Sequence, residues 1–207
     1  MLQLKPVRFN ADAKLLFWSD LHIRHNRDFI LTPRGFQKVE HQDETLPQRL
    51  RERCDAETTL FLLGDTIFGM GAYEYWMRFL GQFVAKAVYI MAGNHFAGLA
   101  EVIDKHGEEF EWAGKQIKIV PNYFEIQVGE QLVVLSHYPM ASWNGINKGS
   151  FHIHGHCHSN LIASEIGKIL YRKRVMDVGI ECCAHPISFK EVCEQIGCGE
   201  VPSVNHL

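Results

Sequence analysis

The stretch Thr58-Thr59-Leu60-Phe61-Leu62-Leu63-Gly64-Asp65 decides the fold that we expect for this chain. Its first six residues are all β-branched or apolar, which is typical of a strand buried on both faces. The run stops at a glycine followed by a carboxylate. Because α/β proteins place their ligands where such strands end, the stretch predicts a buried strand that presents Asp65 to a functional site.

A similar arrangement, a strand-like run followed by polar side chains, recurs on both sides of this stretch. It occurs at residues 14–18 before Ser19-Asp20-Leu21-His22, at 87–91 before Gly93-Asn94-His95, at 131–136 before His137-Tyr138-Pro139, and at 150–154 before Gly155-His156-Cys157-His158. Each run predicts a strand, and each cluster supplies side chains of the kinds that bind metals.

Helices are predicted between the early strands, and the second half of the chain is rich in strands. The expected helices are residues 43–54, 72–85, 98–106 and 188–196. Asp43 is the expected cap of the first, in which Pro47 must lie in the first turn, and Ser188 with Glu191 has the capping-box spacing of the last. Further strands are expected at 115–120, 123–128 and within 168–178, with a tight turn at Gly129-Glu130. Residues 19–42 are expected to be loop with a short helical turn at most. This order predicts an α/β fold of two packed sheets with helices outside.

The overall properties set limits on the class of protein. A chain of 207 residues predicts one domain, residues 1–207. A net charge of -3 gives no basic surface, so binding to long nucleic acid is possible but not favoured. The N-terminus lacks an apolar signal segment, and no apolar run reaches the length of a membrane span. Six cysteines without a CxxC pair indicate free thiols in a cytoplasmic protein with no membrane partner.

The clusters contain carboxylates, imidazoles and one amide, a mixture that suits a pair of divalent cations. Asp20 and His22 are two residues apart, as are His156 and His158, so in an extended segment each pair would point the same way. Asp65 has two oxygens with which to bridge two ions. The alternative, histidines that fall in loops by coincidence, is disfavoured because all the clusters occur in order and several of them follow predicted strands.

With these motifs, the chain resembles the calcineurin-like metallophosphoesterases, and most of all their small bacterial and bacteriophage branch. The resemblance covers about residues 14–195 and includes His25 soon after Asp20-Leu21-His22, the segment Trp143-Asn144-Gly145, and Met176-Asp177-Val178-Gly179. It implies a four-layer α/β/β/α sandwich of two mixed sheets flanked by helices. It also implies a binuclear centre, with manganese favoured and iron, zinc, nickel or magnesium compatible.

Carried over residue by residue, the resemblance assigns Asp20, His22 and His158 to the first metal and Asn94, His137 and His156 to the second. Asp65 would bridge the two metals, and His95 would contact the phosphate or protonate the leaving oxygen. A metal-bridging hydroxide would attack phosphorus. The family usually has an acid directly after this histidine, where this chain has Phe96, so the means by which His95 is oriented is in question.

Polar residues beyond the ligands are candidates for substrate recognition. His25 is favoured for the site because its spacing matches the family branch, and Asn26 and Arg24 lie beside it in sequence. For each of Arg24, Arg27 and Arg34 taken alone, an exposed loop position is the favoured interpretation.

Three functions are compatible with these features. The first is a metal-dependent phosphoesterase that hydrolyses phosphate esters, above all small phosphodiesters such as nucleotides. The second is a nuclease or a phosphomonoesterase. The third is a catalytically weak metal-binding scaffold on the same fold, which Phe96 favours and the complete ligand set disfavours.

Overall fold

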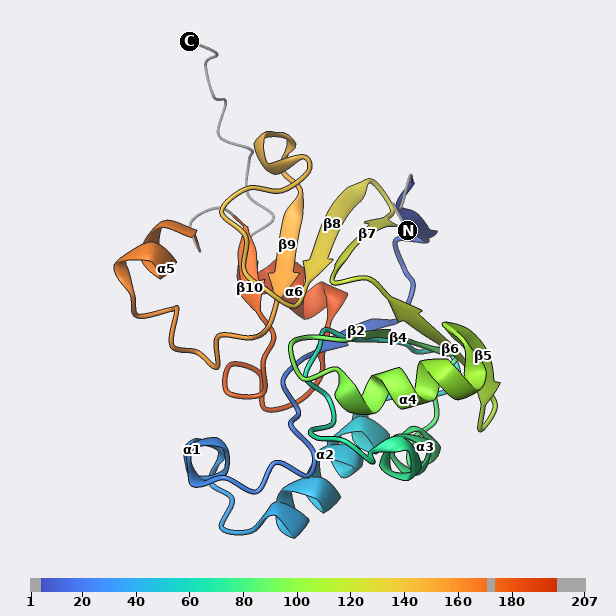
Figure 1. The fold of residues 1–207 in the computed structure, drawn as a ribbon. Coiled ribbons are helices and arrows are strands. Elements are labelled where there is room, and N and C mark those ends of the chain that lie inside the picture. The colour runs from blue at the N-terminus through green and yellow to red at the C-terminus, as the bar shows by residue number, and fades with distance from the viewer. Residues whose placement is uncertain (1–4, 171–173, 197–207) are drawn as a thin grey trace.

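The computed structural model describes residues 5–170 and 174–196, which form two mixed β-sheets flanked by helices, and this confirms the α/β class (Figure 1). The six-stranded sheet contains, in spatial order, β11 (Ile187–Ser188), β2 (Leu15–Trp18), β3 (Thr59–Leu62), β4 (Ala87–Met91), β6 (Lys115–Val120) and β5 (Glu109–Trp112). The five-stranded sheet contains β1 (Val7–Phe9), β7 (Tyr123–Val128), β8 (Gln131–Ser136), β9 (Phe151–His154) and β10 (Val175–Asp177).

The helices follow the expected order, with differences at their ends. They are α1 (Asp28–Leu31), α2 (Val39–Arg53), α3 (Tyr73–Gly81), α4 (Ala97–His106), α5 (Glu165–Leu170) and α6 (Phe189–Ile196), with short 3₁₀ helices η1 (Thr32–Arg34) and η2 (Ile146–Lys148). In Figure 1, α2, α3 and α4 cover the outer face of the six-stranded sheet. On the outer face of the other sheet, Trp143 packs on Val134 and Val175.

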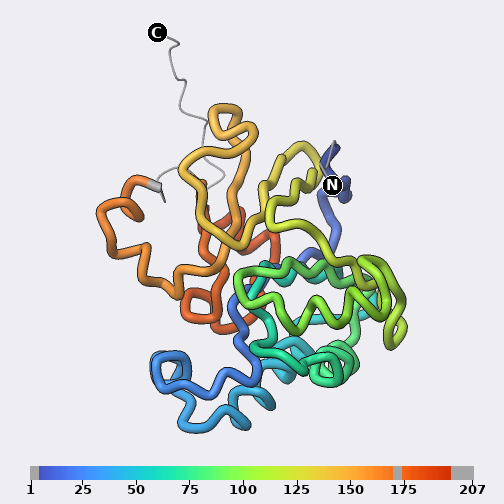
Figure 2. The backbone as a smooth tube through the Cα atoms, in the orientation of Figure 1, coloured from blue at the N-terminus to red at the C-terminus, as the bar shows by residue number. Residues whose placement is uncertain are grey.

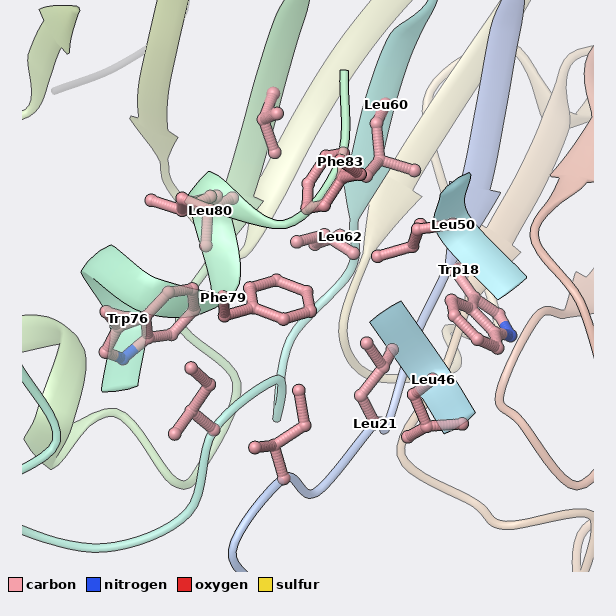
Figure 3. Close-up of a cluster of buried hydrophobic side chains, with 14 of the residues drawn as sticks. Trp18, Leu21, Leu46, Leu50, Leu60, Leu62, Trp76, Phe79, Leu80 and Phe83 are labelled. Carbon is pink, nitrogen blue, oxygen red and sulfur yellow. The ribbon is translucent and has the colours of Figure 1, made fainter. Parts of the chain in front are cut away.

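The buried faces of β2, β3 and β4 explain the layered packing. Alternate residues such as Trp18, Leu60 and Leu62 face α2, α3 and the segment after α3 (Figure 3). Their neighbours, including Phe17 and Phe61, face the five-stranded sheet. Continuous apolar runs are therefore needed because both faces of these strands are covered.

Several sequence predictions need correction. Strands β1, β5 and β11 and helix α5 were not expected; Figure 2 shows that the N-terminal segment lies beside β7 of the five-stranded sheet, far from it in sequence. Helix α2 begins at Val39, and Pro47 lies in its interior. Asp43 therefore lies inside this helix and does not cap it, and both its oxygens accept hydrogen bonds from the Arg24 N–H. Burial of Leu46 and Leu50 offsets the hydrogen bond that Pro47 cannot donate.

Other local predictions are confirmed. The two-residue turn at Gly129-Glu130 joins β7 to β8, with Val128 opposite Gln131. The Ser188 N–H donates to Glu191 Oε2 at 2.7 Å, and the Glu191 N–H donates to Ser188 Oγ at 3.2 Å, so α6 begins with the expected capping box. The predicted strand within 168–178 is β10; residues 168–170 belong to α5, and 171–173 lie outside the described residues.

Two predictions about the whole chain can be compared with the described part of it. The five cysteines there are free thiols, and Cys198 falls outside it. No helix within the described ranges is long and apolar enough to cross a membrane.

Candidate metal centre

The predicted ligands come together because their strands end at one place. β2, β3 and β4 are parallel and in register, so Asp20, Asp65 and Asn94 leave the same edge of the six-stranded sheet. The Asp20 N–H donates to the Gly64 carbonyl at 3.2 Å, and the His22 N–H donates to the Asp65 carbonyl at 2.9 Å. From the other sheet, the Gly155 N–H donates to the His137 carbonyl at 3.1 Å, which joins the ends of β8 and β9.

Left-handed backbone, rather than extended backbone, directs most of these side chains. Five predicted ligands have positive φ angles: Asp20 (57°), His22 (48°), Asp65 (48°), His156 (71°) and His158 (46°). The expectation that each Asp-x-His or His-x-His pair converges through extended alternation was therefore wrong. Non-glycine residues in this region cost free energy and cluster at functional sites, so the backbone itself marks this edge of the sheets.

Two glycines permit the close approach of these segments. A Cβ atom on Gly155 would lie 2.0 Å from Ser19 Oγ and 2.4 Å from Asp20 Oδ2. Gly64 has a φ of +105°, and a Cβ atom there would lie 2.3 Å from His137 Nδ1. Any larger residue at either position would displace a predicted ligand.

Three groups of histidine and aspartate side chains could hold a metal ion. Each group has one ligand atom per residue, all within 4.8 Å of one another; the groups are Asp20–His22–His158, His22–Asp65–His95 and Asp65–His137–His156. Six of the seven predicted ligands and His95 are members, and the seventh, Asn94, contacts two members directly. The structure therefore brings together every metal ligand that the sequence predicts.

Asp65 lies between two of these groups. Its Oδ2 atom is 3.7 Å from His22 Nε2 and 3.5 Å from His137 Nε2, while its Oδ1 atom accepts the His95 N–H at 2.9 Å. A single oxygen of Asp65, Oδ2, therefore faces both ligand groups. The two oxygens of this carboxylate are not divided between the groups. Burial alone would raise the pKa of Asp65, but the hydrogen bond and charge of His137 outweigh it and lower the pKa to about 2.

Asn94, His137 and His156 form one side of the centre, where Asn94 is exposed, His156 is half-buried and His137 is fully buried. Asn94 Oδ1 lies 2.9 Å from both His137 Nε2 and His156 Nδ1. His137 Nδ1 donates to the Leu63 carbonyl at 2.9 Å, so in the neutral ring Nε2 presents a lone pair to the Asn94 oxygen. Two acceptors that face each other at this distance repel, and a turned Asn94 amide, a second proton on the ring or a bound cation would each relieve that repulsion.

Asp20, His22 and His158 form the other side, where Asp20 and His22 are buried and His158 is partly exposed. Asp20 Oδ1 and His22 Nε2 are both buried and have no hydrogen-bond partner. Such orphaned atoms are costly in a folded protein, and a divalent cation would satisfy both. The donors present across the site, two carboxylates with imidazoles and an amide, fit a hard-to-borderline divalent cation.

Burial perturbs the ionisable groups on this side. It raises the pKa of Asp20 to about 6, against the lowering influence of His137 and His158. It lowers the pKa of His22 to about 2, so this ring is neutral and available as a ligand. Perturbed groups that converge in one site are typical of functional centres.

Three further residues support the buried ligands and were not identified from the sequence as parts of the centre. Glu181 Oε1 lies 2.8 Å from His158 Nδ1 and 2.7 Å from Arg34 Nη2. Gln42 donates to the His22 carbonyl at 3.0 Å. Arg34 was expected in an exposed loop, but only 1% of its side chain is exposed. Glu181 carries the signal that identified the ligands, a polar residue soon after a buried strand, here β10.

His95 lies beside the shared carboxylate. Its Nε2 atom is 3.9 Å from Asp65 Oδ2, and its ring meets Phe68 edge-on with centroids 4.9 Å apart. Phe96, the next residue, is 57% exposed and is the N-cap residue of α4. The acid expected after His95 is absent from that position, and the only ion-pair contact recorded for the His95 ring within the described residues is with Asp65.

The candidate substrate-binding residues are distributed differently. His25 is buried, lies with its Nδ1 atom 3.0 Å from His22 Nδ1, and stacks on Phe68. Arg24 points toward α3: it donates to the Met70 carbonyl at 3.3 Å and lies over the Tyr75 ring. Asn26 is exposed. Of the three, the structure places only His25 in contact with a predicted metal ligand.

Comparisons with known proteins give relatives without a described activity. No protein-family model matches the chain. The Gene 66 protein of Mycobacterium phage L5 is 26% identical over 200 residues, which cover 87% of this chain and 92% of that protein. The crystal structure of a protein of unknown function from Aquifex aeolicus is similar with a TM-score of 0.64 and 20% identity, covering 88% of this chain and 99% of that one. At this identity the structural likeness shows the fold alone.

Proposed function

We propose that this protein is a binuclear metal-dependent phosphoesterase that hydrolyses small phosphodiesters such as nucleotides. The observation that carries the proposal is the position of Asp65, whose Oδ2 atom faces His22 on one side and His137 on the other. A carboxylate shared by two ligand groups suits two adjacent dications. Manganese is the favoured metal, with iron, zinc, nickel or magnesium compatible with the same donors.

A pair of bound dications would polarise a phosphoryl oxygen and lower the pKa of a bound water. The protein's own part is to position these ions and the ester. Asp20 and Asp65 are the only carboxylates in the predicted ligand set, so two dications would leave the site with net positive charge. Asn94 contributes an oxygen without reducing that charge. These features favour an anionic ester as substrate.

His95 is suited to the leaving-group side of the ester. About a third of its side chain is exposed, and its backbone N–H is held by Asp65 Oδ1. Its ring can therefore reach a ligand in the open part of the site while its main chain stays fixed. We assign it the role of donating a proton to the leaving oxygen or a hydrogen bond to the phosphate.

Aromatic residues near His95 favour, as substrate, an ester that carries a flat, apolar group. Phe68 stacks on His25 with ring centroids 3.8 Å apart, and Phe96 is exposed next to His95 in the chain. Nucleobases stack on such rings without strong preference for one base. The net charge of -3 gives no basic surface for long nucleic acid, which favours a nucleotide-sized substrate over a nuclease substrate.

Two alternatives follow from the same site. A phosphomonoesterase or nuclease would use the same metals and His95 on another ester. A catalytically weak scaffold is favoured by one observation, namely Phe96 in place of a carboxylate that would orient His95.

Hydrolysis of a chromogenic phosphodiester and the matching monoester tests the proposal. We would measure turnover with manganese, iron, zinc, nickel and magnesium for the wild type, Asp65→Asn and His95→Ala, with the exposed Asp12→Asn as a control for lost charge. We expect faster diester than monoester hydrolysis, loss of turnover in the first two variants and no loss in the control. Metal binding without turnover of either ester would leave the scaffold as the remaining function.

A further inference from the structure

Arg34 makes an unusually complete set of contacts for a residue in a short 3₁₀ helix. Its Nη2 atom donates to the Asp20 carbonyl at 2.8 Å, and its Nη1 atom donates to the Leu21 carbonyl and to Gln42 Oε1, each at 3.0 Å. Its Nε atom donates to Glu181 Oε1 at 2.8 Å. The planar guanidinium group thus joins the Asp20-Leu21-His22 segment to a loop more than 140 residues away in sequence.

Glu181 continues this connection to His158. The Oε1 atom that accepts from Arg34 also lies 2.8 Å from His158 Nδ1. A carboxylate on one ring nitrogen holds the proton there and leaves the other nitrogen for a metal. Glu181 therefore selects Nε2 of His158 as the ligand atom and fixes the plane of the ring.

These contacts reach each of the three ligands that belong to the first metal alone, and they reach neither the shared Asp65 nor the three ligands of the second metal. Arg34 holds the main chain of Asp20, Gln42 holds the main chain of His22, and Glu181 holds the side chain of His158. Within the described residues, the side chains of Asn94, His137 and His156 hydrogen-bond to one another or to other groups, such as the Leu63 carbonyl that His137 contacts.

The charges give Glu181 a second role. Arg34 Nη2 lies 3.5 Å from His158 Nδ1, so a guanidinium cation sits directly behind a predicted ligand of a dication. Its side chain is almost fully buried, and its charge is therefore poorly screened by water. Glu181 neutralises this cation; without it, Arg34 would repel the metal that His158 binds.

We propose that Arg34 and Glu181 are positioning residues that set the affinity of the first metal site, formed by Asp20, His22 and His158, and leave the second site unchanged. The inference rests on the proposed binuclear centre. Removal of Glu181 is expected to convert a protein that binds two metals tightly into one that binds a single metal tightly.

Titration of the metal-free protein with Mn²⁺, followed by calorimetry and by the electron paramagnetic resonance signal of free Mn²⁺, tests this inference. We expect two binding events in the wild type. In Glu181→Gln we expect one of them to weaken about 10- to 100-fold and the other to keep its affinity. Glu109→Gln removes the same charge from an exposed pair with Lys118 and should change neither event. Arg34→Lys retains the charge but cannot make all four contacts, so the same event should weaken.

A second measurement covers the case in which Glu181→Gln fails to fold, which thermal unfolding of the metal-free variant would show. Nitrogen-15 histidine spectra of the zinc-loaded wild type should show His158 with a proton on Nδ1 and the metal on Nε2. Metal on Nδ1, equal weakening of both events, or unchanged affinity in Glu181→Gln would overturn the inference. A wild type that binds no Mn²⁺ or Zn²⁺ would instead refute the binuclear centre itself, and two bound metals without turnover would refute only the phosphoesterase activity.

Discussion

Replacement of Asp20 by asparagine should stabilise the metal-free protein while weakening metal binding. Asp20 is fully buried, and burial raises its pKa from 3.8 to about 6. A difference of this size corresponds to about 3 kcal/mol of free energy at neutral pH. Asparagine has nearly the same shape, and its Oδ1 atom can still accept the His156 N–H that Asp20 Oδ2 accepts at 2.8 Å.

The pH dependence follows from the direction of this shift. Because the folded pKa is above the unfolded one, the folded carboxylate binds its proton more tightly. Its unfavourable contribution is absent below about pH 4, grows as the pH rises, and is complete above pH 6. The amide of Asp20→Asn carries no such penalty, because it does not ionise. The gain of the variant over the wild type should therefore approach about 3 kcal/mol at pH 7 and disappear near pH 4.

Urea unfolding in the presence of a chelator measures this gain. Asp55→Asn is a control that should lower the free energy of unfolding instead of raising it. The Lys14 ammonium and the Thr58 hydroxyl lower the pKa of that exposed carboxyl to about 2, so its ionised form favours the folded state. Manganese at about 1,000 times its dissociation constant would add about 4 kcal/mol to the wild type, so the order of stabilities should reverse when metal is present. A metal-free variant that is less stable than the wild type at pH 7, or a gain that is equal at pH 4 and pH 7, would refute the reasoning.

Two further predictions concern the neighbours of the ligands. Phe96→Asp should raise activity on esters with poor leaving groups more than on activated esters, because a carboxylate there can orient His95; Phe96→Asn, which can also cap α4, should not, and an equal change on both kinds of ester would count against the idea. Gly155→Ala should cost about 1–3 kcal/mol in urea unfolding and weaken the first metal site, because its Cβ would meet Asp20 Oδ2 at 2.4 Å. Gly81→Ala, where a Cβ atom meets nothing within 4 Å, is the matched control, and equal effects of the two substitutions would exclude a steric cause.

The sequence predicted the class of fold because its core strands are unambiguous. Thr59–Leu62 and Ala87–Met91 are apolar on both faces, and this pattern requires cover on both sides. The short strands β1 and β11 carry no such pattern. β1 exists only because β7, more than a hundred residues away, offers it a parallel partner, and such long-range pairing cannot be read from local sequence.

The candidate ligands were predicted as residues, but the way they converge was not. Arg34 is a clearer example of what local sequence cannot predict. Nothing next to it in sequence distinguishes a buried guanidinium from an exposed one, because its partners are the Asp20 and Leu21 carbonyls and Glu181. Its role is defined by contacts that the folded chain creates, and the pattern of a single loop does not contain them.

The failed expectation about Asp20, His22, His156 and His158 is itself informative about the site. Extended backbone is the low-energy choice for such segments, yet all four residues are left-handed. Strain of about 1–3 kcal/mol per residue persists only where the surrounding structure enforces it. Asp20 adds a buried carboxylate to the same segments. A region that combines strained backbone, a raised carboxyl pKa and orphaned acceptors is poorly optimised for stability alone. Departures from low-energy backbone and from full hydrogen bonding are typical of sites that bind a ligand. A positively charged ligand would satisfy the unpartnered acceptors and stabilise the buried carboxylate.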